Sequence, residues 1–97
     1  MNLFMVIQLT YELKDTERDY SDLYSYIESL GETMHFLKNA WWIDLKQNYE
    51  DAILDELKKR MGSEDLFQIV NVTDQYTNGW LAKSSWDWMK EHNKITK

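Results

Sequence analysis

One stretch constrains the fold of this chain more than any other: residues 3–13, which read LFMVIQLTYEL. The run is rich in residues that favour strands and contains neither glycine nor proline. Such a nearly continuous run is typical of a strand that is covered on both faces. We therefore expect residues 3–13 to form the central strand of a sheet, with the rest of the chain pairing with it or packing on it.

Two later segments have the apolar spacing of amphipathic helices. The first spans 19–30, with Asp19 as its expected N-cap and Gly31 as its stop. Its apolar face consists of Tyr20, Leu23, Tyr24, Ile27 and Leu30. The second runs from an N-cap at Asn48 to Gly62, with acids in its first turn and bases in its last, as the helix dipole favours. Its buried stripe is expected to consist of Ile53, Leu54, Leu57 and Met61.

Three further predicted strands complete the order of strands and helices along the chain. Residues 33–37 and 40–46 form a predicted hairpin around Lys38 and Asn39, and residues 66–72 form a further strand. Each helix then connects two strands, which is the β-α-β-β-α-β order of the ferredoxin-like arrangement. We predict an α+β, ferredoxin-like βαββαβ sandwich: a four-stranded antiparallel sheet with two helices on one face, because right-handed crossovers place both helices on the same side.

The chain of 97 residues is expected to be one domain with two parts. Residues 1–72 form the expected ferredoxin-like core, and residues 73–97 form a Trp-rich extension. The extension contains a short helix from Ser84 or Ser85 to about His92, and Ser84 and Asp87 resemble a capping box at its start. The sheet face opposite the helices is expected to carry Phe4, Val6, Gln8 and Thr10, together with Trp42, Asp44 and Lys46. The extension should pack on this face, either in its own subunit or across a homodimer interface. The predicted dimer contacts are Trp42, Trp80, Trp86 and Trp88.

Charge and composition narrow the function classes. The net charge is −6, and residues 1–32 carry seven acids against two bases, a net of −5. Nucleic-acid binding requires clustered Lys and Arg, so we do not expect this composition to bind nucleic acid directly. Cysteine is absent, which removes disulfides and thiolate chemistry. Neither a signal peptide nor a membrane-spanning segment is expected, and we predict a cytoplasmic protein without a cofactor.

Several of these segments resemble a known family. They are YEL at the end of the first strand, YSDLYSYIESLG at 20–31, the hairpin with His35 and WWI at 41–43, and the tail with GWL at 79–81 and SWDW at 85–88. Together they resemble the small SinR-type proteins, which are distinct from the transcription regulator of that name and similar to the Cas-two-like group. The resemblance implies a ferredoxin-like homodimer in which the sequence after the fourth strand contacts the neighbouring subunit.

The same resemblance raises the question of a metal site. Cas-two-like nucleases carry an Asp at the end of the first strand that helps to hold a divalent metal, whereas the matching positions here are Tyr11 and Glu12. Glu12 is a candidate Mg²⁺ ligand only in an alternative interpretation, because a lone carboxylate makes a weak site. His35 and His92 lack the spaced ligands of a zinc site, so we predict structural or surface roles for both and no metal site.

The acidic run Asp15, Glu17, Asp19 and Asp22 has two interpretations. It can be a solvated loop that caps the first helix, or an anionic patch that binds a basic groove on another protein. We predict a small acidic, non-enzymatic protein–protein interaction module with these four residues as the partner-binding site. One form of such a module is an inhibitor, of phage or mobile-element type, of a nucleic-acid-handling enzyme. The alternative is a weak or degenerate Cas-two-like Mg²⁺-dependent nuclease.

Overall fold

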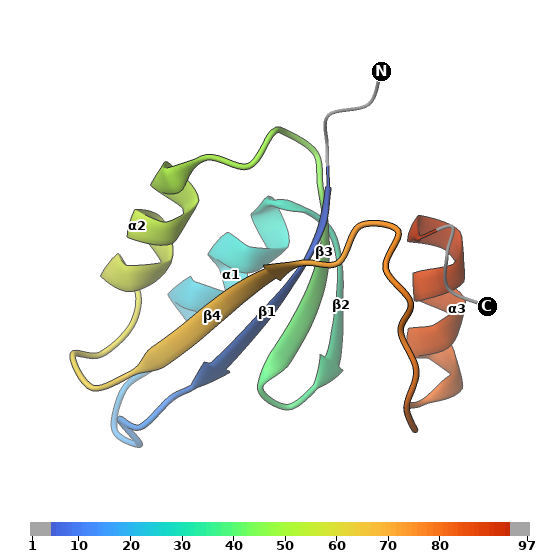
Figure 1. Ribbon diagram of the computed structural model, residues 1–97. Coiled ribbons are helices and arrows are strands. Elements are labelled where there is room, and N and C mark those ends of the chain that lie inside the picture. Colours follow the sequence, from blue (N-terminus) through green and yellow to red (C-terminus); the bar gives the residue numbers. More distant parts are fainter. Residues whose placement is uncertain (1–4, 94–97) are drawn as a thin grey trace.

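A computed structural model of the chain describes residues 5–93 (Figure 1). The predicted Phe4 lies outside the described residues. The elements, in chain order, are β1 (Val6–Glu12), α1 (Ser21–Ser29), β2 (Gly31–Leu37), β3 (Ala40–Leu45), α2 (Asp51–Lys59), β4 (Leu66–Asn71) and α3 (Lys83–His92).

The four strands form one antiparallel sheet in the order β2-β3-β1-β4. The central position predicted for the first strand is confirmed: Leu9 of β1 lies opposite Trp41 of β3 on one side and Ile69 of β4 on the other. Side chains of β3 are buried on both faces of the sheet, and their alternation along the strand places Trp41, Ile43 and Leu45 in one core cluster, as their spacing predicts. The architecture is α+β and is consistent with a ferredoxin-like fold.

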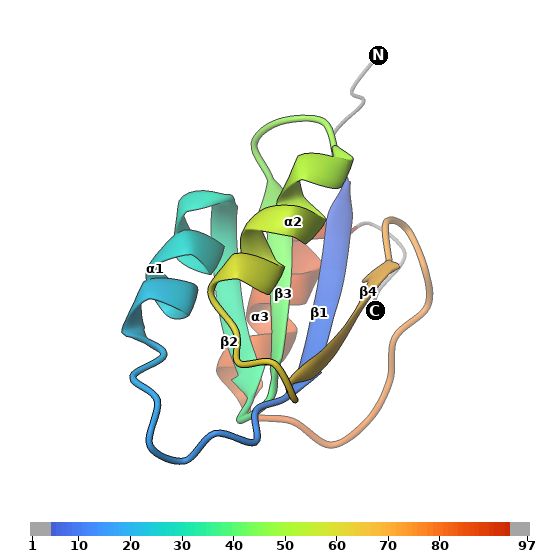
Figure 2. The same ribbon diagram turned by 90° about the vertical axis from the view of Figure 1, so that its left-hand side faces the viewer.

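The helices α1 and α2 lie on the same side of the sheet, in front of it in Figure 2. Leu23 and Ile27 of α1 and Ile53 and Leu57 of α2 are buried there against β1 and β3. Tyr11 of β1 belongs to the same cluster, and its hydroxyl accepts a hydrogen bond from Trp41 Nε1 at 2.9 Å. The apolar stripes of both helices therefore form the main core, hereafter the first cluster.

The opposite sheet face is covered by α3, which lies on the other side of the sheet from α1 and α2 (Figure 1). Val6, Trp42, Val72 and Met89 are buried there and form a second cluster. Trp42 is 2% exposed, its ring stacks on Phe36 with 3.9 Å between centroids, and its Nε1 donates to Gln8 Oε1 at 2.9 Å. The sheet thus separates two apolar layers, and the tail helix supplies one of them.

The sequence located each helix but not its cap. For α1, Tyr20 occupies the N-cap position, while Asp19 accepts a hydrogen bond from the backbone N–H of Ser21. Asn48 is not the N-cap of α2. Glu50 occupies that position, and its carbonyl accepts a hydrogen bond from the N–H of Ile53 in the first turn of the helix. Ser84 is not the N-cap of α3, because Ala82 takes that place and accepts from the N–H of Ser85, so that Ser84 already lies inside the helix.

Two further details of the second helix differ from the expectation. It ends at Lys59, two residues before Met61, and the N–H of Arg60 bonds to the carbonyl of Leu57 in a tightened last turn. Leu54 is 38% exposed, although its spacing places it in the buried stripe. Within α2, Ile53 and Leu57 are the buried residues that face the sheet, and Leu54 lies at the margin of the apolar stripe.

Gly31 does more than end a helix. It is the first residue of β2, and a Cβ atom at this position would overlap the carbonyl oxygen of Asp44 in the neighbouring strand. The close approach of β2 and β3 therefore requires glycine here.

Candidate functional site

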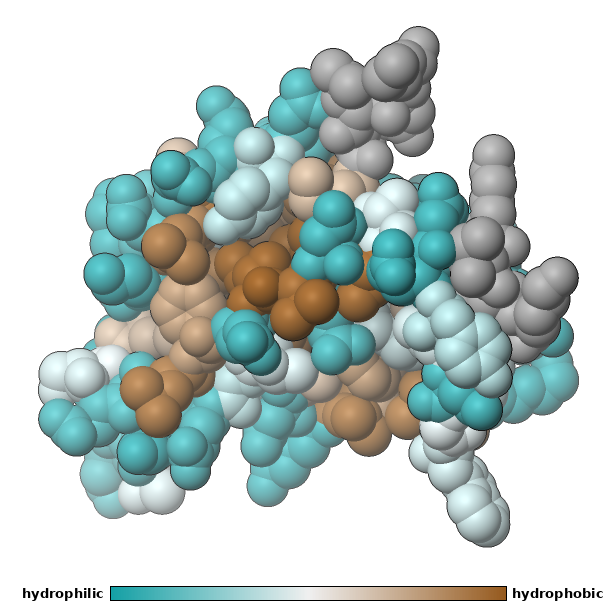
Figure 3. All heavy atoms as spheres, in the orientation of Figure 1, coloured by the Kyte–Doolittle hydropathy of each residue, from teal (hydrophilic) through white to brown (hydrophobic). Residues whose placement is uncertain are grey.

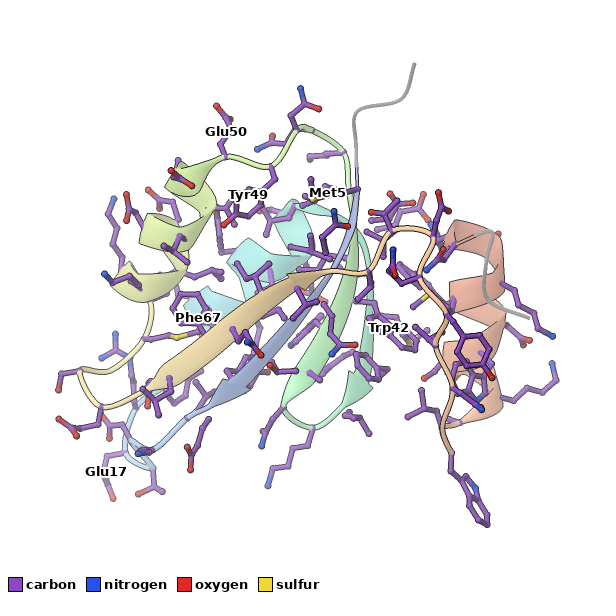
Figure 4. The ribbon with its side chains drawn as sticks, viewed as in Figure 1. Met5, Glu17, Trp42, Tyr49, Glu50 and Phe67 are labelled. Carbon is purple, nitrogen blue, oxygen red and sulfur yellow. The ribbon has the colours of Figure 1, made fainter. Side chains whose placement is uncertain are left out.

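The segment between β1 and α1, residues 13–20, carries three of the four predicted partner-binding carboxylates, and Asp22 follows in the first turn of α1. We call this segment the acidic loop. Figure 4 shows Glu17 at its outer end, directed away from the body of the molecule. Asp15, Glu17, Asp19 and Asp22 are all exposed. The structure therefore presents the four carboxylates on one continuous stretch of accessible backbone.

Three of these carboxylates also have internal partners. Asp15 Oδ1 accepts from the backbone N–H of Glu17 at 3.1 Å, and Asp19 Oδ1 accepts from that of Ser21 at 2.9 Å. The bonds from Ser21 hold the pKa of Asp19 below its ordinary value. Asp22 Oδ2 lies 3.5 Å from Arg60 Nε. Within residues 5–93, the Glu17 carboxylate makes no such contact, so it is the freest of the four to meet another molecule.

Asp65, which precedes β4, fixes the acidic loop to the rest of the molecule. Its Oδ1 accepts from the backbone N–H of Lys14 at 2.7 Å. Its Oδ2 accepts from the Tyr20 hydroxyl and from the N–H of Gly62, each at 2.6 Å. Burial alone would raise the pKa of Asp65, but these three donors outweigh it and the pKa lies below its ordinary value. One side chain thus joins both ends of the acidic loop to the α2–β4 turn.

Sequence reasoning did not single out Asp65. Two of its three partners lie 45 and 51 residues away along the chain, and its local context is an ordinary polar turn. The only local signal is the spacing Gly62-x-x-Asp65, in which an Asp can accept from the glycine N–H as in a capping turn.

The acidic loop and the first residues of α1 together carry a small negative net charge. Residues 13–22 hold four acids against Lys14 and Arg18, which gives 2 − 4 = −2. The guanidinium of Arg18 lies 5.9 Å from the centre of the Tyr20 ring. The acidic loop is therefore anionic, with two cations interspersed among its acids, a pattern that favours a partner with spaced basic groups.

The predicted alternative ligand Glu12 ends β1 and is exposed. It borders a shallow hollow of about 280 Å³, together with Thr10, Leu66 and Gln68. The neighbouring Tyr11 points into the first cluster, where burial raises the pKa of its hydroxyl to about 12. Residues 5–93 contain no group of three or more His, Cys, Asp or Glu side chains placed to hold a metal ion. Glu12 therefore belongs to no such group within the described part of the chain.

The tryptophans predicted as dimer contacts lie in different environments. Trp42 is buried beneath α3, and its ring lies 6.1 Å from that of Trp86 and 6.2 Å from that of Trp88. Trp80, in the loop before α3, is 100% exposed. The structure gathers Trp42, Trp86 and Trp88 into the second cluster and separates Trp80 from them; a dimer contact through these residues stays a prediction.

Both histidines lie against aromatic rings. His35 stacks on Trp41 with 4.1 Å between centroids, and its Nε2 lies 2.9 Å from the carbonyl oxygen of Lys38. His92, at the end of α3, stacks on Trp88 at 4.0 Å, and its Nδ1 lies 2.6 Å from Asp44 Oδ2. The contact between His92 and Asp44 joins α3 to β3, and nothing in the sequence pattern connects these two residues.

No family model matches this chain. No curated protein and no solved structure is significantly similar to it either. In the part of the chain between residues 5 and 93, no helix is both long enough and apolar enough to cross a membrane. The function must therefore be inferred from the surfaces themselves.

Proposed function

We propose that this chain is a non-enzymatic protein–protein interaction module built on a ferredoxin-like domain, and that the acidic loop binds a partner with a basic surface. The strand order β2-β3-β1-β4, with α1 and α2 as connections between strands, supports the assignment of the domain. The resemblance to SinR-type proteins stays a prediction beside it.

One observation carries the functional proposal: the exposed carboxylates belong to a loop that is held in a defined shape. Asp65 joins the two ends of the acidic loop, and Asp15 and Asp19 close its turns. A preorganised loop loses less conformational entropy on binding than a mobile one, so more of the electrostatic attraction appears as affinity. An anionic surface of this kind also accelerates encounters with a basic partner. Competition with nucleic acid for such a basic surface is how this module would act as an inhibitor.

The experiment compares two variants of equal net charge. The first neutralises the loop with Asp15→Asn, Glu17→Gln, Asp19→Asn and Asp22→Asn, which removes charge but keeps the oxygen atoms that accept the local hydrogen bonds. The control carries Glu28→Gln, Asp55→Asn, Asp74→Asn and Glu91→Gln, four exposed acids outside the acidic loop. Each protein is used to capture partners from host lysate, and the captured proteins are identified by mass spectrometry.

We expect a stoichiometric protein partner that the wild type and the control retain and the loop variant loses. Its binding to the wild type should weaken as salt rises from about 0.05 M to about 0.5 M, because exposed charge pairs are screened over this range. Equal loss of the partner in both variants would contradict the assignment to the acidic loop. Recovery of nucleic acid without protein, cleaved with Mg²⁺ by the wild type and not by Glu12→Ala, would favour the nuclease interpretation instead.

A further inference from the structure

The two edges of the sheet differ in how they are protected. β2, at one edge, carries Glu32 and an irregular register between Met34 and Leu37. Charges and bulges of this kind prevent an edge strand from pairing with another chain. β4, at the other edge, reads LFQIVN, has no charged residue, and keeps a regular register with β1 along its whole length. By the same criteria β4 is an open template for strand pairing.

The backbone of β4 has groups available for such pairing. The N–H of Val72 donates to the carbonyl of Val6 at 2.9 Å, which fixes the alternation in this antiparallel ladder. The backbone groups of Gln68 and Val70 therefore point toward β1, and those of Phe67, Ile69 and Asn71 point outward. A further antiparallel strand would find its hydrogen-bond partners at these three residues.

Apolar side chains also accumulate along this edge. Figure 3 shows hydrophobic residues gathered over β4 in the middle of the face turned toward the viewer. Leu66 is 57% exposed and Val70 41%, on the face toward α3. On the other face, Phe67 and Ile69 are only partly buried and border two hollows of about 200 Å³ and 210 Å³. Both faces of β4 thus present apolar surface right up to the open edge.

We propose that a second copy of this chain pairs with the β4 edge, so that two β4 strands run antiparallel about a two-fold axis at Gln68. This register places Leu66 opposite Val70 of the other copy on one face, and Phe67 opposite Ile69 on the other. Both of these cross-strand pairs are apolar, and Gln68 lies opposite Gln68 of the other copy at the axis. The outward backbone groups of Phe67 and Ile69 bond across the axis. Moving the axis by one residue to Ile69 would instead place Phe67 opposite Asn71 and Gln68 opposite Val70.

The charge pattern of α2 favours a second copy over an unrelated strand. Asp51, Leu54 and Lys58 lie on one face of this helix by their spacing, and Lys58 lines the hollow beside Phe67. The same two-fold axis makes the two α2 helices antiparallel on one side of the joined sheet. The Asp51 end of one helix then faces the Lys58 end of the other, and the exposed Leu54 lies near the axis. A contact between the two α2 helices explains why Leu54, an apolar residue, is exposed in the single chain.

The test is the mass of the full chain in solution, measured by analytical ultracentrifugation from about 5 µM to about 500 µM. We expect a reversible species of twice 11.8 kDa. Val70→Lys should raise the dissociation constant at least about tenfold, because a charge then lies opposite Leu66 twice in each dimer. Leu37→Lys is the matched control: its side chain is 52% exposed on the β2 edge, and it should leave the dimer unchanged. Circular dichroism and thermal unfolding check that both variants fold.

A charge exchange tests the α2 contact separately. Asp51→Lys and Lys58→Asp should each weaken the dimer, and the double variant should restore it relative to either one. A wild type that stays at 11.8 kDa throughout the range, or a dimer that tolerates Val70→Lys, overturns the proposal. So does a dimer that is lost with Trp80→Ser and kept with Val70→Lys, since that result places the contact at the tail. None of these outcomes tests the acidic loop, which the partner-capture experiment with the neutralised loop variant tests separately.

Discussion

Asp65 provides the most direct test of the physical argument, because a single carboxylate joins three parts of the chain. Asp65→Ala removes the acceptor for the N–H groups of Lys14 and Gly62 and for the hydroxyl of Tyr20. A hydrogen bond to a charged group contributes about 1.5–3 kcal/mol, and partial exposure of Asp65 places these bonds at the low end or below it. We expect the free energy of unfolding to fall by about 3 kcal/mol.

Urea denaturation at pH 7, followed by tryptophan fluorescence, measures this loss. With a slope of about 1–1.5 kcal/mol/M for a domain of this size, the midpoint should drop by about 2–3 M. Glu64→Ala is the matched control, since it removes an exposed neighbouring carboxylate. A loss below about 0.5 kcal/mol, or the same loss in the Glu64 variant, would refute the assignment of Asp65 as the residue that fixes the acidic loop.

The pH dependence follows from the direction of the shift. The pKa of Asp65 is lower in the folded than in the unfolded chain, so its ionised form stabilises the fold at all pH values above the unfolded pKa of about 4. This contribution is lost as the pH falls through the lowered folded-state pKa. The stability difference between the wild type and Asp65→Asn should therefore be largest near neutral pH and should shrink below about pH 4. A difference that stays constant down to about pH 2.5 would contradict the argument.

Three further substitutions test the packing. Gly31→Ala should lower the free energy of unfolding by at least about 2 kcal/mol in urea, because the added methyl group overlaps the backbone carbonyl of Asp44. Trp42→Ala should cost about 3–5 kcal/mol by the same assay, since this indole is the largest fully buried side chain of the second cluster; a loss under 1 kcal/mol would mean that the cluster contributes little. Trp80→Ser should change the melting temperature hardly at all, because the side chain is fully exposed, and a clear drop would reveal contacts in solution that the structure lacks.

The sequence predicted the layers of this fold better than its contacts. Apolar periodicity placed Leu23, Ile27 and Leu57 on the core side of their helices, and the uninterrupted first run placed β1 at the centre of the sheet. Periodicity gives the direction of a stripe but not its width, which is why Leu54 was assigned to the core although it lies at the exposed margin.

Contacts between segments that are distant in the chain could not be predicted from the sequence pattern. The bonds of Asp65 with Lys14 and Tyr20 and the pairing of His92 with Asp44 join residues 45–51 positions apart, and a local pattern contains no information on such pairs. The helix caps failed for a related reason: Asn48 and Ser84 have suitable side chains, but the start of each helix depends on where the preceding loop leaves the sheet. The acidic loop could be predicted from composition, whereas its defined shape could not.

The position of α3 has a consequence for how the molecule unfolds. The second cluster depends on this one helix, which is joined to β4 through residues 72–82 and held at its end by the bonds of His92 to Asp44 and of Asn93 to the carbonyl of Val72. The first cluster, by contrast, contains no residue of α3. Hydrogen exchange should therefore detect a subglobal opening in which the amides of α3 exchange well before those of β1. During such an opening the buried face of Trp42 is exposed to solvent for a short time. The chain is then prone to aggregation and to proteolysis although most of its native structure persists.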